Sequence, residues 1–167
     1  MSVYTTTLDS PVGALLLAAD DDGLRLIEFP SPRHRYTRGR DWRTGDHPTL
    51  RAAAHQLAAY FTGDLRTFDL PLAPSGTAFQ QTVWRALRDI AYGTTTSYGE
   101  IARRIDKPAA VRAVGAANGR NPLPIVVPCH RVIGTDGALT GFGGGLPTKQ
   151  FLLTLEGALP REDLFAS

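Results

Sequence analysis

The sequence predicts an α/β protein in two parts: a small N-terminal α/β domain with an antiparallel sheet, and a mostly helical C-terminal domain that contains a short sheet. Three observations lead to this fold class. Short β-rich runs separated by turn residues fill the first 29 positions, a helical repeat follows them, and further helical repeats begin after a proline-rich stretch near Ser75. We therefore expect one domain over residues 1–75 and a second over residues 76–167.

Three antiparallel strands are expected near the N-terminus, over residues 3–8, 14–19 and 24–29. Each run is rich in apolar or β-branched residues, which favour extended backbone. The turn signals between the runs are Ser10-Pro11, Gly13 and Asp20-Asp21-Asp22-Gly23. Together these features predict a small meander.

An arginine-rich segment over residues 30–48 separates the strands from the first helix. Its low hydrophobicity predicts a loop, and the pattern assigns no role to residues 33–43. Gly63 is the expected end of the helix, and residues 69–78 are the expected linker. The helical spacing is carried by Leu50, Ala54, Leu57, Ala58 and Phe61.

The second part opens with a capping signature. Thr77 and Gln80 have the spacing of a capping box, in which each side chain accepts a hydrogen bond from the other residue's backbone N–H. Gly93 is the expected end of this helix. Its apolar stripe consists of Phe79, Val83, Trp84, Leu87 and Ile90.

Two short helices joined by a tight turn are expected over residues 97–119. Ser97 with Glu100 repeats the capping signature, and Pro108 suits the first turn of the second helix. The pattern is typical of a helix-turn-helix, with an ordinary helical hairpin as the open alternative. The expected inward residues are Val111 and Val114, and the expected outward ones are Arg112, Ala113, Ala116 and Ala117. Small outward side chains favour a close minor-groove approach over base readout in the major groove.

Composition excludes several classes of protein. The chain has 167 residues, a net charge of +2 and a single cysteine, so an internal disulfide is excluded and neither a metal nor a cofactor is expected. No apolar run approaches the roughly 20 residues that span a bilayer, and no secretory signal is evident, so we expect a cytoplasmic protein. Between residues 100 and 131 there are six Lys or Arg and two acids, a basic patch that alone is weak evidence for nucleic acid.

The lone cysteine lies in "NPLPIVVPCHRV", residues 121–132, where apolar residues give way to ionisable ones in one step. A lone thiol is commonly inert core, but His130 adjoins Cys129 and could serve as the base that a thiol of pKa about 8.5 needs. Glu156 lies among apolar residues, where an unpaired carboxylate is costly, and is a candidate to orient the imidazole. The prolines predict a stiff turn that holds the thiol at a strand end. Surface positions for His130 and Glu156 are the open alternatives.

Three motifs strongly resemble the methylated-DNA–protein-cysteine methyltransferase family, the O(6)-alkylguanine-DNA alkyltransferases: "RAVGAANGRN", "NPLPIVVPCHRVIG" and "GGLPTKQFLLTLEG". The likeness is close over residues 76–157, and the Pro-Cys-His-Arg-Val run at 128–132 is highly specific. It implies a methylated-DNA–protein-cysteine S-methyltransferase that repairs O(6)-alkylguanine, and O(4)-alkylthymine, in double-stranded DNA, with one turnover per molecule. It also implies a monomer, with cooperative binding on DNA left open.

The resemblance implies a role for residues at matching positions. Cys129 resembles the alkyl acceptor, His130 the base coupled to it through a water, and Glu156 the carboxylate that holds the histidine. Asn121 resembles the hinge asparagine that braces the active-site turn, and Tyr98 the tyrosine that assists proton transfer to the departing guanine. The implied substrate pocket consists of Val132, Phe142, Gly143 and Gly144.

Arg112 resembles the arginine that enters the base stack and fills the gap left by a flipped nucleotide. An alkylated guanine oxygen lies inside the duplex, so the base must rotate outward at a cost of a few kcal/mol. The other implied DNA contacts are Ala113, Ala116, Ala117 and Tyr98.

Two departures and two alternatives accompany this interpretation. Phe142 stands where family members often carry Tyr, and Gly143 where some carry Ser, so we expect a looser loop.

A helix-turn-helix module that senses DNA without reacting would not need Cys129. A cysteine hydrolase or transferase for small molecules would turn over repeatedly without DNA.

Overall fold

The N-terminal part of the protein is a four-stranded sheet, in a computed structural model that describes residues 1–31, 38–39, 41–139 and 141–160. Strands β1 (Val3–Leu8), β2 (Leu15–Asp20) and β3 (Gly23–Glu28) pair antiparallel in the predicted meander. Strand β4 (Trp42–Thr44) pairs parallel to β1 and completes the order β3-β2-β1-β4. The predicted α/β fold class is confirmed.

Strand β4 corrects the prediction of a continuous loop over residues 30–48. Its three residues are too few to show a period-two pattern, and they pair because β1 offers an open edge. The rest of the prediction falls partly on residues 32–37 and 40, which lie outside the described residues.

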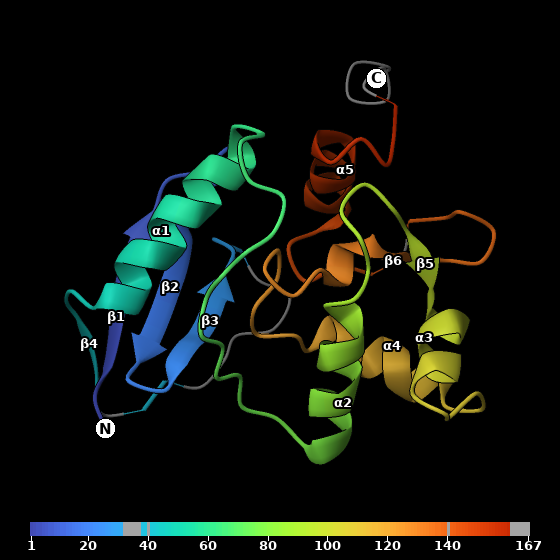
Figure 1. Cartoon of the computed structure of the whole chain (residues 1–167), viewed down its shortest axis with the longest axis horizontal. Helices are drawn as coiled ribbons and strands as arrows, with labels where there is room; N and C mark the ends of the chain where they lie inside the picture. Colours follow the sequence, from blue (N-terminus) through green and yellow to red (C-terminus); the bar gives the residue numbers. More distant parts are fainter. Residues whose placement is uncertain (32–37, 40, 140, 161–167) are drawn as a thin grey trace.

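Helix α1 (Pro48–Phe61) covers one face of this sheet (Figure 1). Pro48 occupies the first turn, where its missing N–H has no cost, and His47 caps the helix by accepting from the N–H of Thr49. Gly63, at φ +80°, follows the end of the helix as predicted. The buried face presents Leu50, Ala53, Leu57 and Tyr60.

Helix α2 (Ala78–Leu87) begins with the predicted capping box between Thr77 and Gln80. It ends at Leu87 rather than at Gly93. The backbone N–H groups of residues 88–90 bond carbonyls three positions back, a tighter winding that closes the helix early.

The remaining elements form the rest of the C-terminal part (Figure 1). They are β5 (Thr96–Ser97), α3 (Tyr98–Arg104), α4 (Val111–Gly119), the 3-10 turn η1 (Cys129–Arg131), β6 (Val132–Ile133) and α5 (Leu146–Leu155). Strands β5 and β6 pair in parallel and form the predicted short sheet. Ser97 caps α3, but the Glu100 side chain turns to Arg103 and Arg104, so only half of the second capping box forms.

Helix α4 buries a different face from the one expected. Val114 is buried as predicted, whereas Val111 is 40 % exposed because it opens the helix. Ala117 is only 3 % exposed, and its carbonyl accepts from Trp84 Nε1 at 2.8 Å. One turn of 3.6 residues places positions 114, 117 and 118 together, so Ala117 belongs to the inner face.

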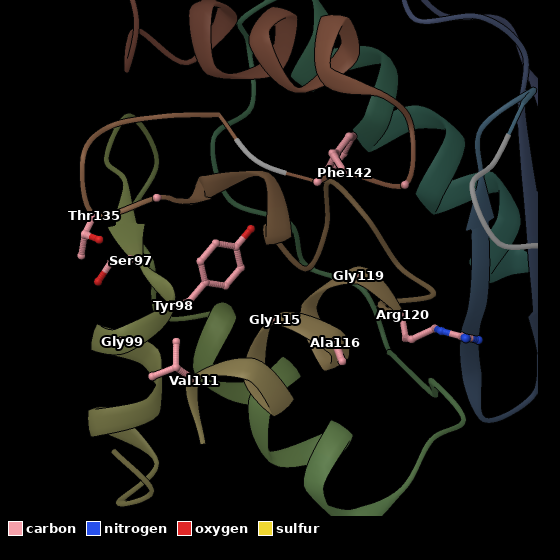
Figure 2. Close-up of a pocket in the computed structure, with 13 residues that line it drawn as sticks. Ser97, Tyr98, Gly99, Val111, Gly115, Ala116, Gly119, Arg120, Thr135 and Phe142 are labelled. Carbon is pink, nitrogen blue, oxygen red and sulfur yellow. The ribbon is translucent and has the colours of Figure 1, made fainter. Parts of the chain in front are cut away.

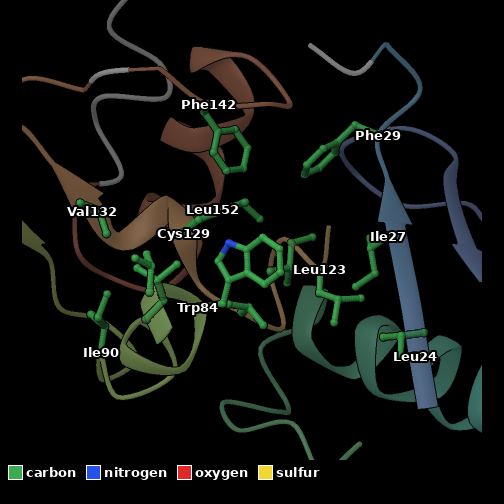
Figure 3. Packing of buried hydrophobic residues seen from close by; sticks show 14 of the residues in the cluster. Leu24, Ile27, Phe29, Trp84, Ile90, Leu123, Cys129, Val132, Phe142 and Leu152 are labelled. Carbon is green, nitrogen blue, oxygen red and sulfur yellow. The ribbon is translucent and has the colours of Figure 1, made fainter. Parts of the chain in front are cut away.

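One apolar cluster joins the two parts of the chain (Figure 3). Leu24 and Ile27 of β3 share it with Leu123 and Leu152, and the backbone N–H of Ile27 donates to the carbonyl of Pro122 at 2.9 Å. The sheet therefore packs directly on the segment that leads to the cysteine. Among the described residues, the helices are too short or too polar to cross a membrane.

Candidate active site

The segment between α4 and the cysteine is an irregular turn braced by Asn121. The Asn121 side chain donates to the carbonyl of Val127 at 2.8 Å and accepts from the N–H of Leu123 at 2.9 Å. Ile125 within this turn has a φ of 75°, a conformation that is strained for a β-branched residue and needs such support. The predicted stiff turn is present, but Cys129 opens the η1 turn before β6 and does not end a strand.

The thiol of Cys129 is buried, with 4 % of the residue exposed, in the same apolar cluster as Val132, Phe142 and Leu152 (Figure 3). Burial raises the pKa of this thiol to about 11, although the Asn121 amide and the Lys149 ammonium oppose the shift. The resting cysteine is therefore a protonated thiol at neutral pH. A nearby base must take its proton before the sulfur can act as a nucleophile.

His130 and Glu156 form a fully buried pair. The histidine Nε2 lies 2.8 Å from Glu156 Oε2, and no described residue hydrogen-bonds its Nδ1. Because a carboxylate only accepts, Nε2 carries the proton and Nδ1 keeps a free lone pair. Burial lowers the pKa of His130 despite the opposing carboxylate, so the ring is neutral and able to accept a proton.

Glu156 also holds partners that the sequence did not reveal. Arg131 donates to Oε1 from Nε at 2.8 Å and to Oε2 from Nη2 at 3.0 Å, and the hydroxyl of Tyr60 donates to Oε2 at 2.6 Å. Burial alone would raise the pKa of Glu156, but the hydrogen bonds from His130 and Arg131 lower it to about 2. The carboxylate is therefore ionised throughout the physiological range.

Lys149 is a further residue that the sequence interpretation missed. It is fully buried on α5, and its Nζ donates to the carbonyl of Val132 at 2.6 Å. Burial lowers the pKa of this lysine to about 8. A signal for it was present, because Lys149, Leu152, Leu153 and Glu156 follow the i, i+3, i+4, i+7 spacing of one helix face. Two charged residues on an otherwise apolar stripe indicate buried, partnered charges.

A cavity of about 830 Å³ opens beside α3, α4 and the loop after β6 (Figure 2). It is lined by Ser97, Tyr98, Gly99, Val111, Gly115, Ala116, Gly119, Arg120, Gly134, Thr135, Gly141, Phe142 and Gly143. Phe142 and Gly143, two of the expected pocket residues, line this cavity, and so does Tyr98, which was expected in proton transfer and DNA contact. Val132 and Gly144 do not, because Val132 is fully buried and Gly144 packs against the ring of Phe29.

The exposed face of α4 lies along the rim of this cavity. Arg112, Ala113 and Ala116 of this helix are exposed, as predicted, and Ala116 lines the cavity, whereas Ala117 is buried. Arg103 and Arg104 lie in the last turn of α3, and both pair with Glu100. The exposed face of α4 therefore borders a cavity whose wall residue Phe142 packs in the same apolar cluster as Cys129, whereas Cys129 itself does not line the cavity.

The fold and this site define a class of protein: one that carries a cysteine beside a buried histidine–carboxylate pair, next to a cavity bordered by a two-helix turn. Two family models match the chain. Residues 3–74 match the ribonuclease-like domain of 6-O-methylguanine DNA methyltransferase, and residues 78–158 match its DNA binding domain.

Named relatives agree over nearly the whole chain. The methylated-DNA–protein-cysteine methyltransferase of Methanosarcina acetivorans is 49 % identical over 93 % of this chain and 99 % of its own, and that of Mycolicibacterium paratuberculosis is 52 % identical over 90 % of both. The crystal structure of Mycobacterium tuberculosis OGT in complex with DNA superposes with a TM-score of 0.85 at 46 % identity, covering 100 % of both chains. This protein belongs to the methylated-DNA–protein-cysteine methyltransferase family, as its motifs predicted.

Proposed function

We propose that this protein repairs alkylated double-stranded DNA by transferring the alkyl group from the O(6) position of guanine, and from the O(4) position of thymine, to its own Cys129. The observation that carries the proposal is the buried His130–Glu156 pair, which leaves a proton-accepting Nδ1 one residue from the thiol. The DNA complex of the Mycobacterium tuberculosis relative supports duplex DNA as the partner.

The reaction balances without a cofactor. The thiol proton of Cys129 passes to Nδ1 of His130, by way of a water, and the sulfur attacks the alkyl carbon as the carbon–oxygen bond breaks. The guanine oxygen keeps the bonding electrons, and Tyr98 on the cavity wall assists return of a proton to the departing base. The products are a thioether and a normal guanine. Because a thioether has no simple route back to a thiol, each molecule acts once.

The two-helix turn of α3 and α4 is the proposed DNA-binding element. The exposed Ala113 and Ala116 permit a close minor-groove approach, and Arg112 fills the space left by the flipped nucleotide. Residues 76–167 would then form the reactive domain and residues 1–75 its scaffold. A cytoplasmic monomer is the proposed working form.

The test of this function is a titration of O(6)-methylguanine duplex with the full chain. We expect normal guanine to appear in a single phase whose amplitude equals the amount of protein, with no second turnover. Continued product formation beyond one equivalent, or hydrolysis of a thioester without DNA, would favour the small-molecule hydrolase instead.

Arg112→Ala should separate duplex repair from the chemical step. We expect a loss of about ten- to a hundredfold in the rate on methylated duplex, because an unfilled gap leaves the unstacking cost of a few kcal/mol partly uncompensated. Reaction with free O(6)-benzylguanine should change little, since no stack is opened. Single-turnover rates on both substrates provide the comparison, and equal losses on both would remove the stack-filling role.

A further inference from the structure

Tyr60 connects the N-terminal part of the chain to the reactive pair. It lies on α1, which covers the sheet (Figure 1), and is fully buried. Its hydroxyl donates to Glu156 Oε2 at 2.6 Å, across 96 positions of sequence. A helix assigned to a scaffold therefore supplies a hydrogen bond to the carboxylate that holds His130.

Tyr60 donates to the same carboxylate oxygen of Glu156 that accepts from His130. Glu156 Oε2 accepts from Tyr60 as well as from His130 Nε2, at 2.8 Å. Burial raises the pKa of Tyr60 far above its usual range, with the neighbouring carboxylate adding to the shift, so the phenol remains a donor at every relevant pH. The Tyr60 hydroxyl therefore keeps its proton and donates it in the hydrogen bond to Glu156 Oε2.

The ring of Tyr60 is held on several sides, so its hydroxyl has little freedom. Ring centroids of Phe61, Phe68 and Tyr92 lie 5.3, 5.6 and 6.3 Å away. A rigid donor fixes the rotation of the carboxylate more firmly than a mobile one would. No motif indicated this contact, because Tyr60 looks like one more apolar position of an amphipathic helix.

We propose that Tyr60 is a positioning residue for alkyl transfer, whose hydroxyl orients Glu156 so that the carboxylate holds the proton of His130 on Nε2 and leaves Nδ1 free to accept the thiol proton. The inference rests on the proposed function. It changes the part that residues 1–75 play, from support of the fold to direct control of the reactive pair.

The charge around the pair sets the direction of the expected effect. Without the phenol, the carboxylate has one donor fewer and stabilises the imidazolium more strongly, so the pKa of His130 rises. The His130 ring is then neutral, and able to accept a proton, only at higher pH. The other titratable or charged groups near the pair are Arg131 from η1, Lys149 from α5, Tyr92 from the segment after α2, and Cys129.

Tyr60→Phe tests the inference, with Tyr92→Phe as the matched control. Both variants keep an aromatic ring in the same cluster, but the Tyr92 hydroxyl lies 3.5 Å from the carbonyl of Leu155 and does not bond Glu156. We expect the single-turnover rate of Tyr60→Phe on O(6)-methylguanine duplex to fall about tenfold, the size associated with one hydrogen bond to a charged group. The acid limb of the pH–rate profile of Tyr60→Phe should move to higher pH, while Tyr92→Phe keeps the wild-type profile.

The possible outcomes distinguish failure of the proposed function from failure of the proposed role of Tyr60. Failure of the wild type to transfer methyl overturns the proposed function itself. A wild type that transfers, with Tyr60→Phe matching its rate and pH profile and losing only thermal stability, overturns the role of Tyr60. If the variant does not fold, 3-fluorotyrosine at position 60 decides, because it keeps the ring and its hydroxyl donates more strongly to Glu156. A pH–rate profile whose acid limb moves to lower pH supports the inference, and an unmoved limb contradicts it.

Discussion

Cys129→Ser should abolish alkyl transfer while leaving the binding of methylated duplex close to that of the wild type. An alkoxide is far harder to form than a thiolate, and removing a nucleophile commonly costs about a millionfold in rate. Binding should survive because the exposed face of α4 is unchanged, and Cys129 itself is only 4 % exposed. Single-turnover assays and DNA titrations with the same duplex measure the two properties side by side.

This substitution also distinguishes the alternatives left by the sequence. A protein that senses lesions without reacting predicts full activity for the serine variant. Cys129→Ala is the companion variant, because it removes the heteroatom altogether and leaves only a small change in volume. Residual repair by either variant would mean that the alkyl group has another acceptor.

Glu156→Gln is expected to damage both stability and catalysis. The carboxylate accepts from Tyr60, His130 and Arg131, and an amide cannot satisfy all of them or balance the guanidinium charge. Breaking a buried ion pair by removing one partner typically costs about 3–5 kcal/mol of unfolding free energy. The rate should fall by about 100- to 10,000-fold, as when the carboxylate of a catalytic triad is neutralised and the histidine takes the wrong tautomer.

The pH dependence of stability provides a separate measurement on the same carboxylate. Its pKa is lowered from 4.5 to about 2 by the hydrogen bonds from His130 and Arg131, which outweigh burial, so the folded state binds fewer protons than the unfolded state between these values. The stabilisation is therefore complete above pH 4.5 and is lost as the pH falls towards 2. Urea unfolding across this range should show a steep acid loss in the wild type and a shallower one in Glu156→Gln.

Glu100→Gln is the matched control, because Glu100 is a surface carboxylate paired with Arg103 and Arg104 on α3. Solvent screens such pairs, so we expect little change in the free energy of unfolding or in its dependence on pH. An acid slope in Glu156→Gln as steep as that of the wild type would contradict the assignment of the slope to Glu156.

Local sequence signals predicted local structure well. Thr77 with Gln80 placed the start of α2, and the alternation of apolar and turn residues placed the first three strands. Such features depend on interactions between residues that are close in sequence, so short segments are enough to predict them. Strand β4 has no such signal, because it forms only where a distant edge accepts it.

Some residues of the candidate active site could be predicted from the sequence, and others could not. Cys129, His130 and Glu156 could be suggested by chemistry, since a base and an orienting carboxylate were required. The structure brings the histidine and the carboxylate together, but the roles themselves remain proposals. Tyr60 and Arg131 could not be found, because their polar ends are defined only by contacts that the complete fold creates.

The helix faces show the limit of periodicity. Val111 and Ala117 exchanged sides relative to the prediction, since spacing gives the angle between residues and not the direction of the core. That direction is set by tertiary packing, such as that of Trp84, whose Nε1 donates to the carbonyl of Ala117. The exposed set that remains, Arg112, Ala113 and Ala116, still presents one charge and two small side chains.

The most direct test of the central claim is to locate the transferred group on the protein. After reaction with one equivalent of O(6)-methylguanine duplex, intact-mass measurement should show a gain equal to one methyl group in place of hydrogen, and peptide fragmentation should place it on the sulfur of Cys129. Unmodified protein that still binds the duplex normally, or a methyl group on any other residue, would contradict the account.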